Sequence, residues 1–173
     1  DFHDLDHGLE WCEDQMLDAR RLAQREDPQT ALQLLAQQIG DEVASIQFIS
    51  YLSEVAFAPG DQLMRQGEES GDLYFVERGD VSVYLKPAAG ETVRIRRTGP
   101  GTVLGELGFY LGTPRSASVI AENTGKAYRL TAASLERMER EHPALAAAMH
   151  RFIADLLAER LLRTTRTLEG VLS

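Results

Sequence analysis

Hydrophobic and polar positions divide the chain into three zones with different periodicities. Residues 4–40 carry apolar side chains at helical spacing, among many acidic and amide side chains. Pro28 interrupts this zone, because the residue before a proline disfavours the helical region, and Asp27 is the expected cap of a second helix. Residues 51–130 instead show short alternating runs separated by Gly and Pro turn signals. Residues 131–171 return to helical spacing, so the chain is expected to run helix, sheet, helix.

The middle zone predicts a small antiparallel β-barrel or jelly roll, since many short strands at this spacing are typical of those folds. In one of its runs, Val81, Val83 and Leu85 are expected to face inward, with Ser82 and Tyr84 facing outward or to an edge. The fold class is therefore α+β, with a jelly roll flanked by N-terminal helices and a C-terminal helix pair. The domain boundaries expected are 1–40 for a helical segment and 41–173 for the main domain. Seven strands are expected: Ser53–Phe57, Gln62–Arg65, Leu73–Glu77, Val81–Leu85, Thr92–Arg97, Ala117–Ala121 and Lys126–Leu130.

The last zone predicts two helices. Thr131 or Ser134 can cap the first, and Pro143 restarts the chain for the second. The second helix carries a stripe of leucines and other apolar residues from Leu145 to Leu168, which is expected to be core or a dimer seam.

The charge balance limits the classes of function. Apolar residues make up 43% of the chain and charged residues 26%, an ordinary globular balance, and the net charge of −9 argues against a general nucleic-acid binder. Residues 1–72 carry a net charge of −12 and residues 73–173 a net charge of +3, so an anion-binding site is expected in the second part.

The single cysteine, Cys12, forms no internal disulfide and indicates a reducing compartment. No run of apolar residues is long enough to span a membrane, and a chain that begins at Asp1 is interpreted as a piece of a longer protein.

Residues 101–121 carry the chemistry. Glycines before a short helical turn allow backbone N–H groups to approach a ligand closely, and a helix N-terminus favours an anion. Arg115 adds a fork of donors and Ser116 a hydroxyl, whereas the carboxylate of Glu106 suits a sugar hydroxyl. A phosphate, a ribose and an apolar surround together indicate a nucleotide with few charges.

This stretch resembles the phosphate-binding cassette of cyclic nucleotide-binding domains, whose core reads Gly-Glu-Leu, about eight residues, then Arg-Ser/Ala/Thr-Ala. The resemblance covers about residues 45–170. It implies that Glu106 binds the ribose 2′-hydroxyl and that Arg115 and Ser116 bind the exocyclic phosphate oxygens. The remaining residues that it implicates are the motif glycine Gly105, the backbone N–H groups near Leu107 and Ala117, and Val83 and Val103, which would line the base and sugar pocket.

The closing helix is similar over residues 158–165 to the helix of the bacterial catabolite activator that reads the adenine edge. Thr164 and Thr165 fall on the hydroxyl pair of that helix, and Arg160 falls on an arginine beside the pocket. This similarity favours cAMP as the ligand, and cGMP stays open because a hydroxyl suits either base. The helix would close over the base as a lid.

Residues 4–14 resemble the final helix of the STAS domain in bacterial SulP-type anion transporters, some of which carry a cyclic nucleotide-binding domain after it. The resemblance implies a regulatory, non-enzymatic domain on the cytoplasmic face of the inner membrane, with the STAS and transmembrane parts of its transporter as partners. The nucleotide would be a ligand and no cofactor is expected. His3, His7 and Cys12 have the spacing of metal ligands but no second cluster completes a site, so no metal is expected either.

Two alternatives stay open. The domain could keep the cassette shape without binding a nucleotide and serve as a structural or dimerising module, with a homodimer formed through the C-terminal helix. A transcription factor fragment would need a DNA-binding region beyond Ser173, so nucleic acid is not an expected partner.

Overall fold

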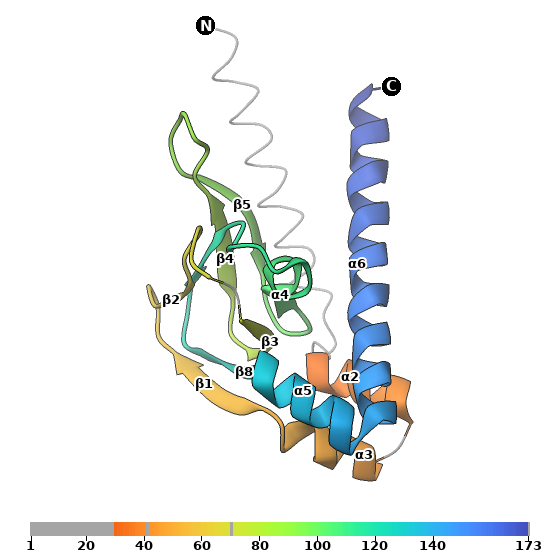
Figure 1. Cartoon of the computed structure of the whole chain (residues 1–173). Coiled ribbons are helices and arrows are strands. Elements are labelled where there is room, and N and C mark those ends of the chain that lie inside the picture. Colours follow the sequence, from red (N-terminus) through yellow and green to blue (C-terminus); the bar gives the residue numbers. More distant parts are fainter. Residues whose placement is uncertain (1–29, 41, 70, 173) are drawn as a thin grey trace, which may run out of the picture.

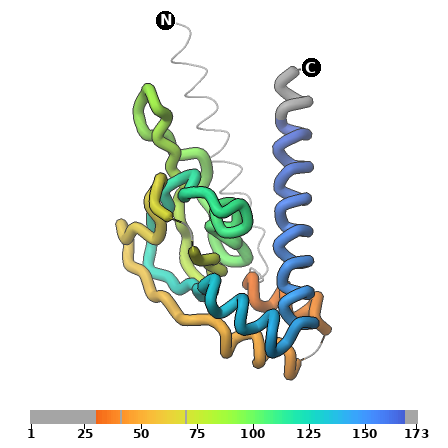
Figure 2. The backbone as a smooth tube through the Cα atoms, in the orientation of Figure 1, coloured from red at the N-terminus to blue at the C-terminus, as the bar shows by residue number. Residues whose placement is uncertain are grey.

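A computed structural model describes residues 30–172 except 41 and 70, with side chains as far as 167. Two helices precede a set of strands, and two helices follow it (Figures 1 and 2). The elements are α2 (Ala31–Ile39), α3 (Glu42–Ile49), β1 (Ser53–Phe57), β2 (Gln62–Met64), β3 (Asp72–Arg78), β4 (Val81–Leu85), β5 (Val93–Thr98), β6 (Val103–Leu104), α4 (Glu106–Leu111), β7 (Ser118–Ala121), β8 (Gly125–Thr131), α5 (Ala132–Glu141) and α6 (Pro143–Leu172).

The strands form two four-stranded antiparallel sheets, in the orders β1-β8-β3-β6 and β2-β7-β4-β5. Neighbours along the chain often lie in different sheets, which is the arrangement of a jelly roll. A buried cluster from both sheets fills the space between them, so the sheets pack face to face. Its members are Phe57, Met64, Val76, Val81, Val83, Leu104, Val119, Ala121 and Ala127.

The expected alternation along β4 is correct for Val81 and Val83 but wrong for Leu85, whose side chain is 37% exposed. The bulge between β4 and β5 leaves Ile95 of β5 unpaired and does not change the alternation of β4. Leu85 lies one residue beyond Tyr84, where the pairing of β4 with β7 ends, so no strand of the sheet covers it on that side. Ser82 was expected to face outward, yet it is fully buried. Its partners on the two neighbouring strands are Ile120 and Arg97, whose side chains are longer than that of serine.

A second core lies between the other sheet and the helices. Leu73 and Phe75 of β3 contact a cluster that includes Leu35 of α2 and Met149 and Ile153 of α6. Residues 31–39 therefore pack on the strands and on α6. Thr30 caps α2, and its side chain and that of Gln33 form a reciprocal capping box. The cap expected at Asp27 and Pro28 lies outside the described residues.

The end of the chain follows the expectation for two helices. Thr131 caps α5 by accepting a hydrogen bond from the Ser134 backbone N–H, and α6 begins at Pro143. The first half of α6 is buried through Leu145, Met149 and Phe152, but Leu161 is 69% exposed, so the apolar stripe continues past the core. In Figure 1, α6 runs alongside the side of the sheets that carries α4.

Candidate ligand-binding site

The site is built on a glycine at the start of α4. Gly105 has a φ of 83°, in the left-handed region, and directly precedes the helix. A Cβ at this position would overlap the guanidinium of Arg115 and the carbonyl oxygen of Asp72. Only glycine allows both the turn and this close approach.

Arg115 is held under the turn by its side chain and by its backbone. Its guanidinium donates to the carbonyl oxygens of Gly105 at 3.1 Å and Asp72 at 2.8 Å. Its backbone exchanges hydrogen bonds with the loop after β2, receiving one from Gly67 and donating one to Glu68. A guanidinium has five N–H donors, so donors remain for the oxygens of an anion.

Glu106, the first residue of α4, is buried and forms an ion pair with Arg160 of α6. Arg160 also donates to the carbonyl oxygen of Val103 at 2.9 Å. A buried carboxylate without a partner would be costly, and Arg160 compensates it. The pair connects the cassette directly to the C-terminal helix.

The structure thus brings together Gly105, Glu106, Arg115 and Arg160. Ser116 and Leu107 are exposed beside them, and Ala117 is half-buried. Which of these residues contact a ligand stays a prediction.

Val83 and Val103 do not share one cluster. Val83 packs between the sheets, where Leu104 joins it, whereas Val103 packs in the helical core with Phe75. Adjacent residues of a strand face opposite sides, which explains the separation of Val103 from Leu104.

Thr164 and Thr165 are exposed on α6. Their hydroxyls donate to the helix carbonyls of Arg160 at 3.1 Å and Leu161 at 3.0 Å. Thr164 lies one turn after Arg160 and shares its face of the helix, whereas Thr165 follows Leu161. Their oxygens can still accept a hydrogen bond, so a role in reading the base stays a prediction.

Arg96 of β5 is a half-buried arginine that the sequence analysis did not name. Burial lowers the pKa of the Arg96 guanidinium from its ordinary value, and the positive charges of Arg160 and Arg163 lower it further, while Glu106 acts in the opposite direction. Arg96 lies opposite Val83 on the paired strand β4, so the two side chains share one face of the sheet. The arginine-rich sequence of β5 was the feature that could have drawn attention to Arg96. Which of these arginines faces inward depends on the bulge between Val83 and Tyr84, and the sequence does not show that bulge.

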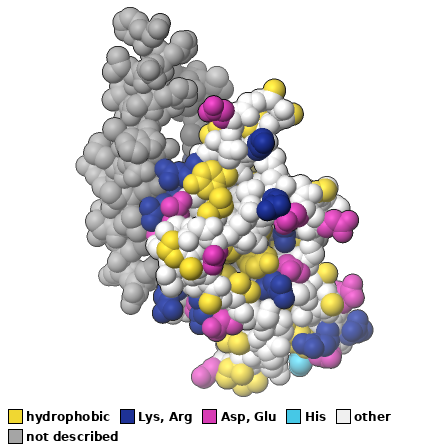
Figure 3. All heavy atoms as spheres, turned by 90° about the vertical axis from the view of Figure 1, so that its left-hand side faces the viewer, with side chains coloured by type: hydrophobic (Ala, Val, Ile, Leu, Met, Phe, Trp, Pro, Cys, Tyr) yellow, Lys and Arg dark blue, Asp and Glu magenta, His cyan; other side chains and the backbone are white. Residues whose placement is uncertain are grey.

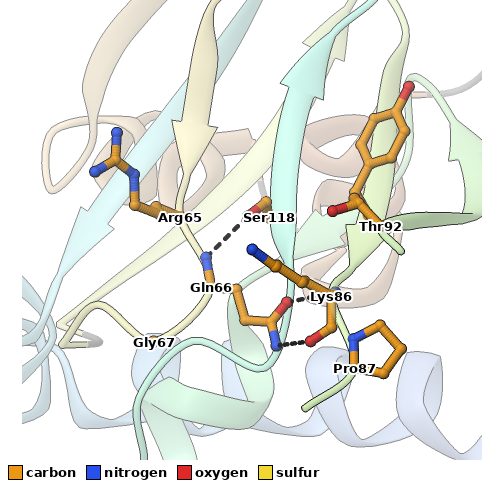
Figure 4. A pocket seen from close by; sticks show the side chains of 8 residues that line it. Arg65, Gln66, Gly67, Lys86, Pro87, Thr92 and Ser118 are labelled. Atoms are coloured by element: carbon orange, nitrogen blue, oxygen red, sulfur yellow. Dashed lines mark hydrogen bonds between the residues drawn. The ribbon is translucent and has the colours of Figure 1, made fainter. Parts of the chain in front are cut away.

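A separate cavity of about 410 Å³ lies beside the ends of β2 and β4 (Figure 4). The side chain of Gln66, one of its lining residues, exchanges hydrogen bonds of 3.0 and 2.8 Å with the backbone of Lys86. None of the predicted ligand residues lines it. Its lining is Arg65, Gln66, Gly67, Tyr84, Lys86, Pro87, Thr92 and Ser118.

Two negative findings concern the described part of the chain. No helix there is both long and apolar enough to cross a membrane. No group of three or more His, Cys, Asp and Glu side chains there could hold a metal ion, and His3, His7 and Cys12 lie outside it. Acidic and basic side chains are interspersed on the molecular face shown in Figure 3.

Comparison with known proteins identifies the class. The family model for the cyclic nucleotide-binding domain matches residues 54–142. The chain belongs to this family, and its predicted fold class is confirmed by solved structures. A cyclic nucleotide-binding domain from Methylobacillus flagellatus is similar with a TM-score of 0.71 and 21% identity, covering 76% of this chain and 79% of that chain. The catabolite activator protein of Thermus thermophilus is similar with a TM-score of 0.64 and 25% identity, covering 76% and 60%.

A curated relative extends the similarity beyond the family model. Glutaminase 2 of Bradyrhizobium diazoefficiens is 32% identical over 162 residues, which are 91% of this chain and 24% of the relative. The chain thus spans about a quarter of the length of that relative. Domains of this family are generally regulatory rather than catalytic, which agrees in general terms with the non-enzymatic role expected.

Proposed function

We propose that this chain binds a cyclic nucleotide at the turn from Gly105 to Ala117 and passes the binding event to α6. The observation that carries the proposal is the arrangement of Glu106 and Arg115 around Gly105, with Glu106 tied to α6 by Arg160. Arg115 supplies donors for the phosphate and Glu106 accepts from a ribose hydroxyl. The sequence favours cAMP over cGMP, and the cytoplasm, where these nucleotides occur, is the proposed location.

The proposed coupling follows from the two contacts between α4 and α6. Besides the Glu106–Arg160 pair, the Tyr110 hydroxyl lies 2.8 Å from Nδ1 of His150. A ribose hydroxyl that donates to Glu106 would compete with Arg160 for the carboxylate, so the ligand would favour a position of α6 in which this ion pair is weakened. Only such a difference in affinity between positions of the helix can shift its population.

Calorimetric titration of the chain with cAMP and cGMP tests the binding. Linear AMP and GMP are the matched control ligands, because they differ in the ring closure of the phosphate. Heat with a cyclic nucleotide that disappears in a folded Glu106→Ala variant supports the proposal. No heat with either cyclic nucleotide, on a sample shown to be folded, contradicts it.

A second candidate function is a module that dimerises without a nucleotide. The exposed Leu161 and Leu162, at 69% and 58%, support it, because together they leave apolar surface on the helix that a second copy could cover. Sedimentation of a Leu161→Glu variant tests it. A dimer that this change converts to a monomer, together with no binding of cyclic nucleotides, would favour this function over the first.

The parent protein has two candidates. The sequence resemblance of residues 4–14 to STAS domains supports a SulP-type anion transporter, with its STAS and transmembrane parts as partners. The similarity to Glutaminase 2 supports a glutaminase-type enzyme that carries the domain as a regulatory part. The coding sequence on either side of this segment distinguishes them, since one parent has membrane spans and the other a catalytic domain.

A further inference from the structure

The cavity beside the ends of β2 and β4 lies on the outer face of its sheet. Two of its lining residues, Tyr84 of β4 and Ser118 of β7, lie directly opposite one another. Val83 and Val119, the adjacent pair of the same two strands, are buried between the sheets. Successive residues of a strand face opposite sides, so Tyr84 and Ser118 face away from that core. The cavity is therefore separate from the proposed nucleotide site, whose Arg115 side chain donates to the other sheet.

The loop after β2 forms one wall of the cavity and is fixed by several hydrogen bonds. The Gln66 side chain exchanges hydrogen bonds of 3.0 and 2.8 Å with the backbone of Lys86, directly after β4. The Gln66 backbone N–H donates to the Ser118 hydroxyl at 2.9 Å. The Gly67 backbone N–H donates to the carbonyl oxygen of Arg115 at 2.8 Å. These contacts hold the wall in place, so the cavity is formed before a ligand enters it.

The side chains that line the cavity offer hydrogen-bond donors and carry no negative charge. Figure 4 shows the Lys86 side chain directed toward Ser118. Within the described part of the chain, neither the Lys86 ammonium nor the hydroxyls of Tyr84 and Thr92 have a hydrogen-bond or ion-pair partner. Ser118 accepts from Gln66, so its own proton is left for a ligand. An ammonium and three hydroxyls, with no Asp or Glu in the lining, favour an anion.

The charge and the walls of the cavity indicate the class of anion. The Arg65 guanidinium is directed away from Lys86 and pairs with Glu68 at 3.9 Å (Figure 4). The positive charge that the described residues direct into the cavity is thus that of Lys86, which matches one carboxylate better than a doubly charged phosphate. Tyr84 and Pro87 add apolar surface, and about 410 Å³ is a suitable volume for a small molecule.

We propose that this cavity binds a small organic carboxylate. Its oxygens accept hydrogen bonds from the Lys86 ammonium and the Ser118 hydroxyl, and its apolar body lies against Tyr84 and Pro87. The inference goes beyond the proposed function and does not depend on it. Because the same wall holds the backbone of Arg115, the ligand would lie against the loop that supports the cassette.

Benzoate is the probe for this site, because it joins a carboxylate to a flat apolar body, and benzamide is the matched uncharged ligand. In an NMR titration of the isotope-labelled chain, benzoate is expected to shift the backbone amide signals of Gln66, Lys86 and Ser118 until they saturate. It is expected to bind about tenfold more tightly than benzamide, since hydrogen bonds from an ammonium to a carboxylate are stronger than those to an amide. Shifts that leave these three signals in place overturn the inference, as do equal affinities for the two ligands.

Lys86→Gln removes the charge and keeps a long polar side chain, so it is expected to weaken benzoate binding about tenfold. Arg94→Gln is the matched control. Arg94 lies opposite Tyr84 and is exposed, but it does not line the cavity, so the affinity for benzoate is expected to stay unchanged. Equal losses in the two variants would show a general attraction of anions to this face and would overturn the inference.

Arg115→Lys separates this inference from the proposed function. The change is expected to weaken the binding of a cyclic nucleotide and to leave the affinity for benzoate unchanged. A loss of benzoate binding in this variant, on a sample shown to be folded, would place benzoate in the nucleotide site and overturn the inference. A wild-type chain that binds a cyclic nucleotide but no benzoate overturns this inference alone, whereas one that binds benzoate but no cyclic nucleotide overturns only the proposed function.

Discussion

Arg160 on α6 forms an ion pair with the buried carboxylate of Glu106, the first residue of α4, and the same guanidinium donates to the carbonyl oxygen of Val103. One side chain thus joins the C-terminal helix to the strand before the cassette and to the cassette helix. Since the partners are 54 residues apart in sequence, the contact is a tertiary one that closes the site from the helical side. Under the proposed function, Arg160 and a ligand hydroxyl would compete for the Glu106 carboxylate.

Removal of Arg160 is the first prediction. Arg160→Ala leaves the Glu106 carboxylate buried without a cation, and we expect the free energy of unfolding to fall by about 2 kcal/mol, less than for a fully buried pair because Arg160 is partly exposed. Urea unfolding measures the change. Arg163→Ala, an exposed change one turn along the helix, is the control and is expected to stay within about 0.5 kcal/mol. Equal effects of the two substitutions would show that the ion pair does not stabilise the fold.

Gly105→Ala is the second prediction. An alanine here would have to keep the left-handed backbone of Gly105, which is unfavourable for a residue with a Cβ. The new Cβ would also overlap the Arg115 guanidinium and the Asp72 carbonyl oxygen, so we expect the free energy of unfolding to fall by at least about 2 kcal/mol. The nucleotide affinity is expected to fall with it, because Arg115 is displaced. Gly112→Ala at the other end of α4 is the matched control. It has a φ of 63° but nothing within 4 Å of the added atom, so it is expected to cost only about 1 kcal/mol.

Arg115→Lys separates charge from geometry. An ammonium keeps the positive charge but cannot hold two carbonyl oxygens and a phosphate in the planar fork of a guanidinium, so we expect the dissociation constant for a cyclic nucleotide to rise by about tenfold or more. Titration calorimetry on samples checked by thermal unfolding measures this. The control is Arg97→Lys, since Arg97 pairs with Asp80 away from the cassette. An unchanged affinity in the Arg115 variant would remove this residue from the binding site.

The strands were predictable from the sequence because alternation and glycine turns are local signals. All seven expected strands correspond to strands of the structure, with ends that agree or differ by one residue, whereas β6 was too short to show a period. The bulge between Val83 and Tyr84 was not predictable in this way, since register depends on how β4 pairs with β5. Leu85 was placed inside because the alternation continues to the end of β4, whereas the pairing of β4 with β7 ends at Tyr84.

The same limit applies to the site. Gly105, Glu106 and Arg115 lie within one short segment, so their spacing was enough to bring them together in the prediction. Arg160 was placed beside the pocket only through a resemblance, because the rotation of a helix is set by packing. Arg96 was missed, since its inward direction follows from its partner Val83 and from the bulge, and neither is visible in the arginine-rich run itself.

The last prediction concerns alkaline pH. Burial raises the pKa of Tyr110 to about 12, and the negative charge of Glu139 adds to the rise, against an ordinary value of 10.0. Above pH 10 the unfolded chain therefore releases the Tyr110 proton while the folded chain keeps it. The unfolded state then binds fewer protons than the folded state, so the contribution of this group to stability is complete below pH 10 and is lost as the pH rises to about 12.

Tyr110→Phe isolates this contribution. It removes the titrating hydroxyl and its hydrogen bond to His150, so we expect the variant to be less stable than the wild type at pH 8 and the difference to shrink between pH 10 and about 12. Urea unfolding at a series of pH values measures the difference. Tyr84→Phe, in a tyrosine outside the contacts between α4 and α6, controls for the loss of a hydroxyl. A difference between Tyr110→Phe and the wild type that stays constant across this range would show that Tyr110 titrates as it does in the unfolded chain.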